Sequence, residues 1–187
     1  MSRRLESLDK QVVSIDPLIM MGEAVGLHGG LRLNDYAQRV SHELSQRPNT
    51  MLQYTPENIY RAMLEGRTVV ATDLYNDQLL AFAQLWKYGV NSNGKDIYEF
   101  GSWLSFSRGG GRQVLTAGSM LGHQIDSSAQ VIAIVEHSNA RAQQTITQVG
   151  GIFLHSAISE KLVTKAGTPA PIKIYDVSNS TVQRSTR

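Results

Sequence analysis

The chain of 187 residues contains no cysteine. This absence excludes disulfide bonds, thiolate metal sites and a cysteine nucleophile. Proline is scarce as well, with five residues, and charged residues make up only 18% of the chain. Because 41% of the residues are hydrophobic, the composition is nevertheless typical of a folded globular protein of about one domain, and not of a disordered chain.

The sequence also has no long hydrophobic run. Its most apolar early stretch, residues 17–27, is interrupted by Glu23 and is shorter than the roughly 20 residues that a membrane span needs. Residues 2–10 are polar, and no signal-peptide core follows them. We therefore expect a cytoplasmic protein that has no membrane partner.

Charge of one sign is not concentrated anywhere in the chain. The formal net charge is +2, and no long run of lysine or arginine is present. Nucleic-acid-binding proteins usually carry a basic stripe, so we expect no nucleic-acid partner. None of the five histidines stands at a metal-ligand spacing from a second ligand, so we also expect no metal site.

Hydrophobic periodicity predicts an α/β protein in which helices flank a central mixed sheet. We expect helices at 34–46, 56–66, 112–123 and 138–150, and strands at 68–74, 79–88, 97–105, 131–135, 152–154 and 171–177. The unbroken apolar run at 131–135 is typical of a strand that is covered on both faces and paired in parallel. The expected organisation is a poorly defined N-terminal segment over residues 1–30, a single domain over residues 31–178 and a polar tail over residues 179–187.

A glycine-rich run, Arg108-Gly109-Gly110-Gly111-Arg112, lies between an expected strand and an expected helix. The first N–H groups of a helix have no partner within the helix and carry partial positive charge, so they attract an anion. Glycines let the backbone approach a phosphate closely, and flanking arginines add charge-assisted hydrogen bonds. The run matches neither a P-loop nor a Rossmann fingerprint. It predicts a phosphate-binding loop, with a flexible turn that binds nothing as the alternative.

A second motif follows the apolar run at 131–135. It reads Asn-x-x-Ala-x-x-x-Ile-x-x-x-Gly-Gly, from Asn139 to Gly151. Together with the glycine run and the order of the elements, it resembles the GNAT superfamily of N-acetyltransferases, in which the corresponding helix commonly reads Asn-x-x-Ala-x-x-x-Tyr-x-x-x-Gly-Phe. The sequence departs from the family at Ile146, which stands where many members have a tyrosine that protonates the coenzyme A thiolate. The glycine run also departs from the family's Arg/Gln-x-x-Gly-x-Gly/Ala pattern.

The resemblance implies a central mixed sheet of about six to seven strands, with acetyl-CoA as co-substrate. The pyrophosphate of coenzyme A would bind the backbone amides of residues 108–112. The pantetheine arm would pair with the third expected strand near Trp103, Leu104 and Ser105, whose N–H groups could polarise the thioester. Asn139 would lie near the pantetheine or the thiol.

Acyl transfer to an amine requires a base that removes a proton from the nitrogen. Glu99, on the third expected strand, is the candidate, and an exposed carboxylate without a role is the alternative. Tyr175 and Ser138 are weaker candidates for the acid that Ile146 does not supply. His137 would lie near the cofactor cleft or serve as a surface histidine. The acceptor, a small-molecule or peptide amine, would bind against the first helices.

The function predicted from the sequence is therefore that of an acetyl-CoA-dependent N-acetyltransferase, which moves the acetyl group directly to an amine. The departures from the family motifs keep a second function open, that of a non-catalytic sensor or scaffold that binds acyl-CoA. A third is a small α/β protein that binds an unrelated anion. A homodimer stays open as well.

Overall fold

The computed structural model describes residues 17–26, 30–47, 51–73, 75, 77–107, 110–164 and 166–180. The strands are β1 (Pro17–Met21), β2 (Thr68–Asp73), β3 (Leu79–Val90), β4 (Asp96–Ser105), β5 (Gln130–Glu136), β6 (Ile152–Val163) and β7 (Pro169–Asp176). The helices are α1 (Glu23–Gly26), α2 (Gly30–Ser45), α3 (Pro56–Leu64), α4 (Gly110–Ile125) and α5 (Ala140–Gln148).

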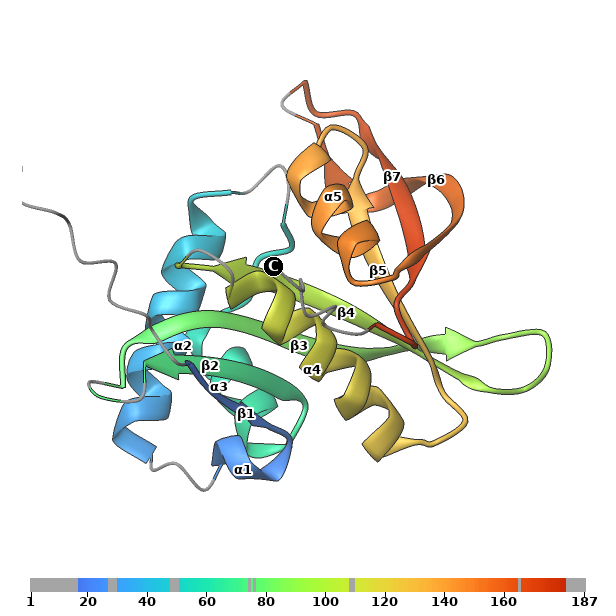
Figure 1. The fold of residues 1–187 in the computed structure, drawn as a ribbon. Helices are drawn as coiled ribbons and strands as arrows, with labels where there is room; N and C mark the ends of the chain where they lie inside the picture. The colour runs from blue at the N-terminus through green and yellow to red at the C-terminus, as the bar shows by residue number, and fades with distance from the viewer. Residues whose placement is uncertain are drawn as a thin grey trace, which may run out of the picture.

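Seven strands form one mixed sheet in the order β1-β2-β3-β4-β5-β7-β6 (Figure 1). Only β4 and β5 are parallel, and the other neighbouring strands are antiparallel. The apolar strand β5 lies inside the sheet, between β4 and β7, as its unbroken hydrophobic run predicts. The predicted fold class, a central mixed sheet of six to seven strands with flanking helices, is confirmed.

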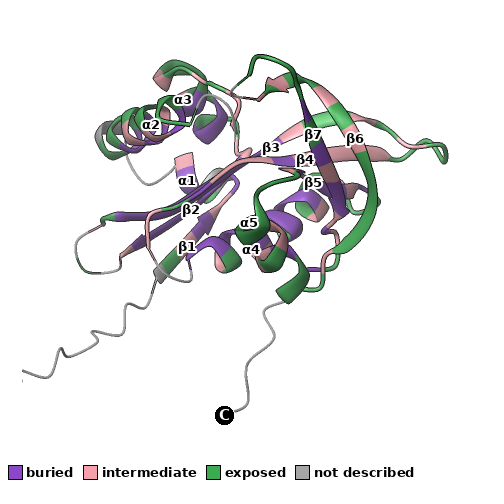
Figure 2. Ribbon diagram, turned by 90° about the horizontal axis from the view of Figure 1, so that it is seen from above, coloured by how far each residue is buried: buried purple, intermediate pink, exposed green. Residues whose placement is uncertain are grey.

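Helices cover both faces of this sheet (Figure 2). On one face α2 and α3 bury a cluster that includes Leu33 and Ile59 of the helices and Phe82 of β3. On the other face α4 and α5 bury a second cluster, to which β3 contributes Leu85. Because neighbouring side chains of a strand point to opposite faces, β3 supplies both clusters and holds the three layers together.

The N-terminal part contains more regular structure than the sequence indicated. β1 pairs with β2, with Met20 opposite Val70, and Gly22 makes the turn into α1 with a φ of 60°. Helix α2 begins at Gly30, four residues before the predicted start at Asn34. Periodicity missed β1 because a five-residue strand beside several glycines shows little pattern. Residues 1–16 lie outside the described residues, as do residues 181–187.

Strand β6 is also much longer than predicted, since it runs over Ile152–Val163 and not only over residues 152–154. Residues 155–163 lie at the edge of the sheet and are mostly exposed, and their polar and apolar residues do not alternate regularly. Among the described residues, no helix is both long and apolar enough to span a membrane.

Candidate active site where two parallel strands separate

The parallel strands β4 and β5 pair over only part of their length. The paired residues extend from Ile97 opposite Gln130 to Phe100 opposite Ala133, although both strands continue beyond Phe100 and Ala133. A cleft of about 140 Å³ lies at the place where the ladder stops. The lining comes from the α2–α3 segment, β4, β5, the start of α5 and β6: Arg47, Met51, Leu52, Glu99, Phe100, Gly101, Ser102, Trp103, Ala133, Ile134, Val135, Glu136, Asn139, Ala142 and Leu162. The cleft thus borders a strand edge that an extended ligand can pair with.

A β-bulge shapes the β4 wall of this cleft. Ser102 and Trp103 together oppose the single residue Ala83 of β3, so β4 contains one extra residue there. Ser102 has a φ of 49°, in the left-handed region that is unfavourable for residues other than glycine. Bulges redirect a strand and take a residue out of the ladder, and here the bulge lies at the cleft. The signal in the sequence is Gly101, a glycine inside a strand.

A buried glutamine holds the bulge in place. Gln84 of β3 is fully buried, and its Nε2 donates a hydrogen bond of 2.7 Å to the Ser102 hydroxyl. Its amide oxygen has no hydrogen-bond partner among the described residues. The neighbouring Thr68 of β2 lies opposite Gln84, and its buried hydroxyl also has no partner in that part of the chain. Such unpartnered atoms cost stability, which suggests that the amide is retained for the geometry it imposes.

Trp103 connects the cleft to the first turn of α4. Its indole N–H donates to the carbonyl oxygen of Gly111 at 3.1 Å, and its ring meets Phe100 edge to face at 5.8 Å. A Cβ atom on Gly111 would lie 3.3 Å from the Trp103 ring, and one on Gly110 would lie 3.1 Å from Ala81 Cβ. The two glycines therefore let α4 begin in close contact with β3 and β4.

The predicted phosphate-binding run is described only in part. Helix α4 begins at Gly110, two residues before the predicted start, and Arg112 is exposed in its first turn. Arg108 and Gly109 lie outside the described residues. The N-terminus of a 16-residue helix thus lies beside the cleft, with the partial positive charge that an anion needs. Pyrophosphate binding there stays a prediction.

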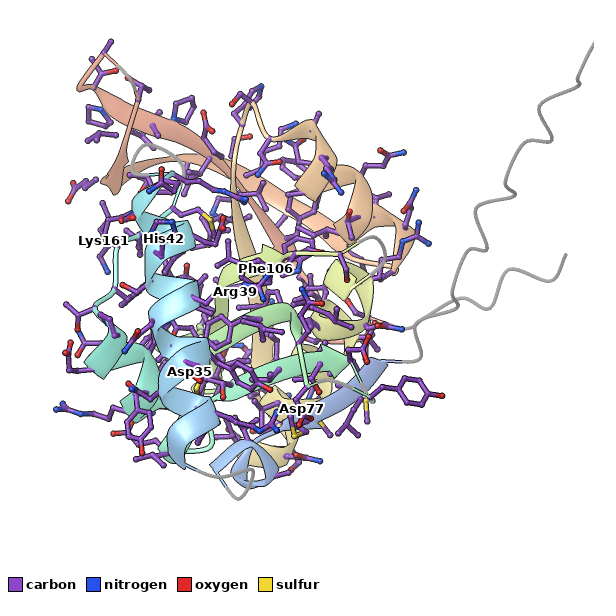
Figure 3. The ribbon with its side chains drawn as sticks, turned by 90° about the vertical axis from the view of Figure 1, so that its left-hand side faces the viewer. Asp35, Arg39, His42, Asp77, Phe106 and Lys161 are labelled. Atoms are coloured by element: carbon purple, nitrogen blue, oxygen red, sulfur yellow. The ribbon has the colours of Figure 1, made fainter. Side chains whose placement is uncertain are left out.

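The segment that leads from β4 to α4 is tied to α2. The guanidinium of Arg39 lies 4.5 Å from the centre of the Phe106 ring (Figure 3). Near the N-terminus of α2, Arg32 forms an ion pair with Asp77, which precedes β3. These contacts hold α2 against the segments that precede β3 and follow β4.

Asn139 lies at the start of α5 and lines the cleft. Its Oδ1 accepts a hydrogen bond of 3.1 Å from the Ala142 backbone N–H, so Asn139 is the N-terminal cap of α5. The hydroxyl of Ser138 donates to Glu136 at 2.7 Å. His137 is exposed and is not among the residues that line the cleft.

Neither Ile146, which replaces the family's tyrosine, nor Tyr175, a candidate for the missing acid, lines the cleft. Ile146 is fully buried in the core under α5. Tyr175 is buried as well, with its hydroxyl 3.4 Å from Gln143 Oε1 and its ring edge to face with Phe153. Burial raises the pKa of Tyr175. Ile146 has no acidic proton, and Tyr175 does not line the cleft, so neither can donate a proton there.

Glu99 projects from β4 on the side of α2 and α3. It lies opposite Trp86 of β3, while the next pair, Leu85 with Phe100, belongs to the core on the opposite face. Burial raises the pKa of the Glu99 carboxyl, and the positive charge of Lys161 on β6 lowers it by a smaller amount. A carboxylate whose pKa is raised towards neutrality is a better general base.

A larger groove of about 690 Å³ lies on the same side. It shares Leu52, Glu99, Ile134 and Leu162 with the cleft, so Glu99 lies where the two cavities meet. Its other lining residues are Tyr54, Trp86, Lys87, Tyr88, Ala157, Ile158, Ser159, Glu160, Lys161, Ile172 and Ile174. The half-buried carboxylate of Glu99 therefore faces both cavities.

Aromatic stacking forms one part of the groove. Tyr54 lies parallel to Trp86 with 5.4 Å between ring centres, and Arg67 covers Trp86 at 4.2 Å. Burial raises the pKa of Tyr54, and the nearby charge of Glu99 raises it further. Tyr54 is therefore a neutral hydroxyl at physiological pH and not a second base.

The structure brings together three of the predicted site residues, Glu99, Trp103 and Asn139. Leu104 turns its side chain into the core beneath α2, and the Ser105 hydroxyl donates to the Ser107 carbonyl oxygen. Sequence analysis missed Gly101, Ser102, the β5 wall and the groove residues of β6. Among the described residues, no group of three or more metal-ligating side chains gathers, and His28 lies outside them.

Comparison of the sequence with protein-family models and with curated proteins finds no match. Solved structures do match its fold. YncA from Salmonella typhimurium, solved with its cofactor acetyl-CoA, aligns with a TM-score of 0.63 at 11% identity, over 91% of this chain and 96% of that one. A ribosomal-protein-alanine N-acetyltransferase from Brucella melitensis aligns with a TM-score of 0.63 at 14% identity, over 85% of this chain and 98% of that one.

A third matching structure is described as a member of the GNAT family. An acetyltransferase of the GNAT family from Streptococcus pneumoniae aligns with a TM-score of 0.59 at 14% identity, over 86% of this chain and 98% of that one. At such identities the likeness shows the fold. The chain has the fold of the GNAT acetyltransferases, as the order of its elements and the motif that begins at Asn139 predicted.

Proposed function

We propose that this protein is an N-acetyltransferase that transfers an acetyl group directly from acetyl-CoA to an amine. One observation carries the proposal: the half-buried carboxylate of Glu99 lies where the cleft between β4 and β5 meets the groove on the α2 side. The shared fold with acetyltransferases, one of them solved with acetyl-CoA, supports the same assignment.

The features around the cleft fit coenzyme A. Beyond Phe100 the edge of β4 has no β5 partner, so its backbone can pair with the amide groups of a pantetheine arm near Trp103, Leu104 and Ser105. The N-terminus of α4, with Gly110 to Arg112 and the preceding Arg108 and Gly109, would receive the pyrophosphate. Asn139 would lie near the thiol end, because it lines the cleft.

Acetyl-CoA would supply the acetyl group as an activated thioester. Glu99 would accept a proton from the amine nitrogen, directly or through a water molecule, so that the nitrogen can form the new C–N bond as the C–S bond breaks. Backbone N–H groups of the bulged β4 wall would hold the carbonyl oxygen while it gains negative charge. Because Ile146 has no acidic proton and Tyr175 does not line the cleft, solvent or the acceptor itself would return a proton to the sulfur.

The decisive measurements are coenzyme A binding and turnover. Acetyl-CoA at 100 times its Kd should stabilise the protein by about 2.7 kcal/mol in thermal or chemical unfolding. Thiol release with a panel of amines then tests catalysis. Binding without turnover would favour a non-catalytic acyl-CoA sensor, and absence of binding would favour a protein with an unrelated anion ligand.

Glu99→Gln tests the proposed base. We expect kcat to fall by about 10²- to 10⁴-fold, the usual contribution of a general base, with coenzyme A affinity retained. Glu160→Gln, a change to an exposed carboxylate of the same groove, is the matched control and should leave kcat within a few-fold of the wild type. Equal losses in both variants would remove Glu99 from the mechanism.

Glu99→Gln should also change how the stability of the protein depends on pH. Folding raises the pKa of Glu99, so the folded state holds this proton more tightly than the unfolded state does. The stabilising contribution of the Glu99 carboxyl is complete at pH values below its pKa in the unfolded state. It is lost as the pH rises through its pKa in the folded state. Glu99→Gln should therefore make the protein more stable than the wild type at neutral pH, and this advantage should disappear in acid.

A further inference from the structure

We propose that the acceptor is a small primary amine with a single charge and an aromatic or branched aliphatic body, bound in the groove beside Glu99. This inference rests on the proposed acetyl transfer, because it assigns the groove to the second substrate. It goes further by naming the chemical class of that substrate from the side chains that line the groove.

The body of the acceptor follows from the walls of the groove. Ile172 and Ile174 of β7 are only 5% and 6% exposed, and they cluster with Ile134 of β5 and Leu162 of β6. The stacked rings near the entrance from the α2–α3 segment add aromatic surface. A volume of about 690 Å³ lies within the range of small-molecule pockets.

A bulge in β6 places the end of the hairpin over this groove. Ser159 pairs with Ala170 and Val163 pairs with Pro169, so residues 160–162 are extra relative to β7. Leu162 from this bulge lines both the cleft and the groove. Figure 3 shows Lys161 projecting on the side of the molecule that carries α2. The bulge thus narrows the groove next to the carboxylate, which favours a compact ligand.

The charges define how many amines the ligand carries. Glu99 is the half-buried acid of the groove, whereas Glu160 and Lys161 are exposed and have opposite charges. Lys87 forms an ion pair with Asp96 at 2.7 Å, so its charge is already matched. A polyamine would need an acidic partner for each ammonium group. An amino sugar would bury hydroxyl groups against isoleucine side chains, which is costly.

The test is a structure–activity series with the full chain and acetyl-CoA. For n-alkylamines from ethylamine to hexylamine, kcat/KM should rise roughly fourfold for each added methylene, the value expected for burying one CH₂ group. Phenethylamine and 3-methylbutylamine should exceed spermidine, glucosamine and a peptide with a free N-terminus. A flat series, or a preference for any of these last three, would overturn the inference while leaving acetyl transfer intact.

Two variants separate the groove from general effects on folding. Ala157→Leu fills the groove from β6 and should lower kcat/KM more for hexylamine than for ethylamine. The neighbouring Ser156→Leu is the matched control, because Ser156 pairs with Lys173 and does not line the groove. Loss of hexylamine preference in both variants would contradict the inference. Absence of turnover with every amine would instead mean that the proposed function itself is wrong.

Discussion

Replacing Gln84 with methionine tests whether the buried amide is retained for the geometry of the bulge and not for stability. Methionine has nearly the same length and volume, so it leaves little cavity. The change removes two things: the 2.7 Å hydrogen bond to the Ser102 hydroxyl and the buried amide oxygen that has no partner among the described residues.

The two effects on stability have opposite signs. Loss of the hydrogen bond costs about 1 kcal/mol, while removal of a buried polar atom without a partner gains about 1–3 kcal/mol. The free energy of unfolding should therefore rise by roughly 0–2 kcal/mol. Urea unfolding monitored by fluorescence or circular dichroism measures this difference, provided that the dependence on urea concentration is unchanged.

The effect on activity should go the other way. Ser102 holds a left-handed conformation that costs about 1–2 kcal/mol, and the hydrogen bond from Gln84 offsets it. Without that bond the β4 wall can relax, and displacements of about 1 Å at a reacting centre cost on the order of 100-fold in rate. We therefore expect kcat/KM to fall by roughly 10- to 100-fold in a protein that is at least as stable.

Thr68→Val provides the matched control. It removes the neighbouring buried hydroxyl, which is also without a partner in the described part of the chain, but it does not touch the bulge. It should stabilise the protein and leave turnover unchanged. A Gln84→Met variant that loses 2 kcal/mol or more, or that keeps full activity, would refute the role assigned to the amide.

Three further predictions concern other parts of the site and its scaffold. Lys161→Gln removes the positive charge that lowers the pKa of Glu99, so the acidic limb of the kcat/KM pH profile should move to higher pH, and an unmoved limb would contradict this. Gly118→Ala would place a Cβ 2.2 Å from the Phe100 ring, so it should cost about 1–3 kcal/mol in urea unfolding despite the better helix propensity of alanine. Asn139→Ala removes the cap of α5 and should cost about 1 kcal/mol, and unchanged stability would mean that the cap is not needed.

Much of the fold could be read from the sequence because local patterns depend on residues only a few positions apart. The unbroken apolar run at 131–135 indicated an interior strand with a parallel neighbour, which β5 is. Thr55 before Pro56 indicated the start of α3, and its hydroxyl accepts from the Asn58 N–H at 3.3 Å. The motif that begins at Asn139 indicated the helix α5, which runs over Ala140–Gln148.

Other elements carried weak local signals. β1 is short and stands beside glycines, and β6 lies at a sheet edge, where most of its residues are exposed and do not alternate regularly. Their strand conformation depends on pairing with β2 and β7, which are far away in sequence or follow later in the chain. Periodicity cannot report such pairing, since the partner and not the segment itself supplies the hydrogen bonds.

The sequence by itself determined the class of the fold, the absence of cysteine chemistry and the presence of a glutamate on the strand before the glycine run. Only the tertiary structure decided that this glutamate, Glu99, is half-buried where two cavities meet. Its environment comes from Tyr54, Trp86 and Lys161, which lie on three separate segments of the chain. A pKa depends on burial and on charges that are close in space, so it is set when these segments pack together and not by the neighbours of Glu99 along the chain.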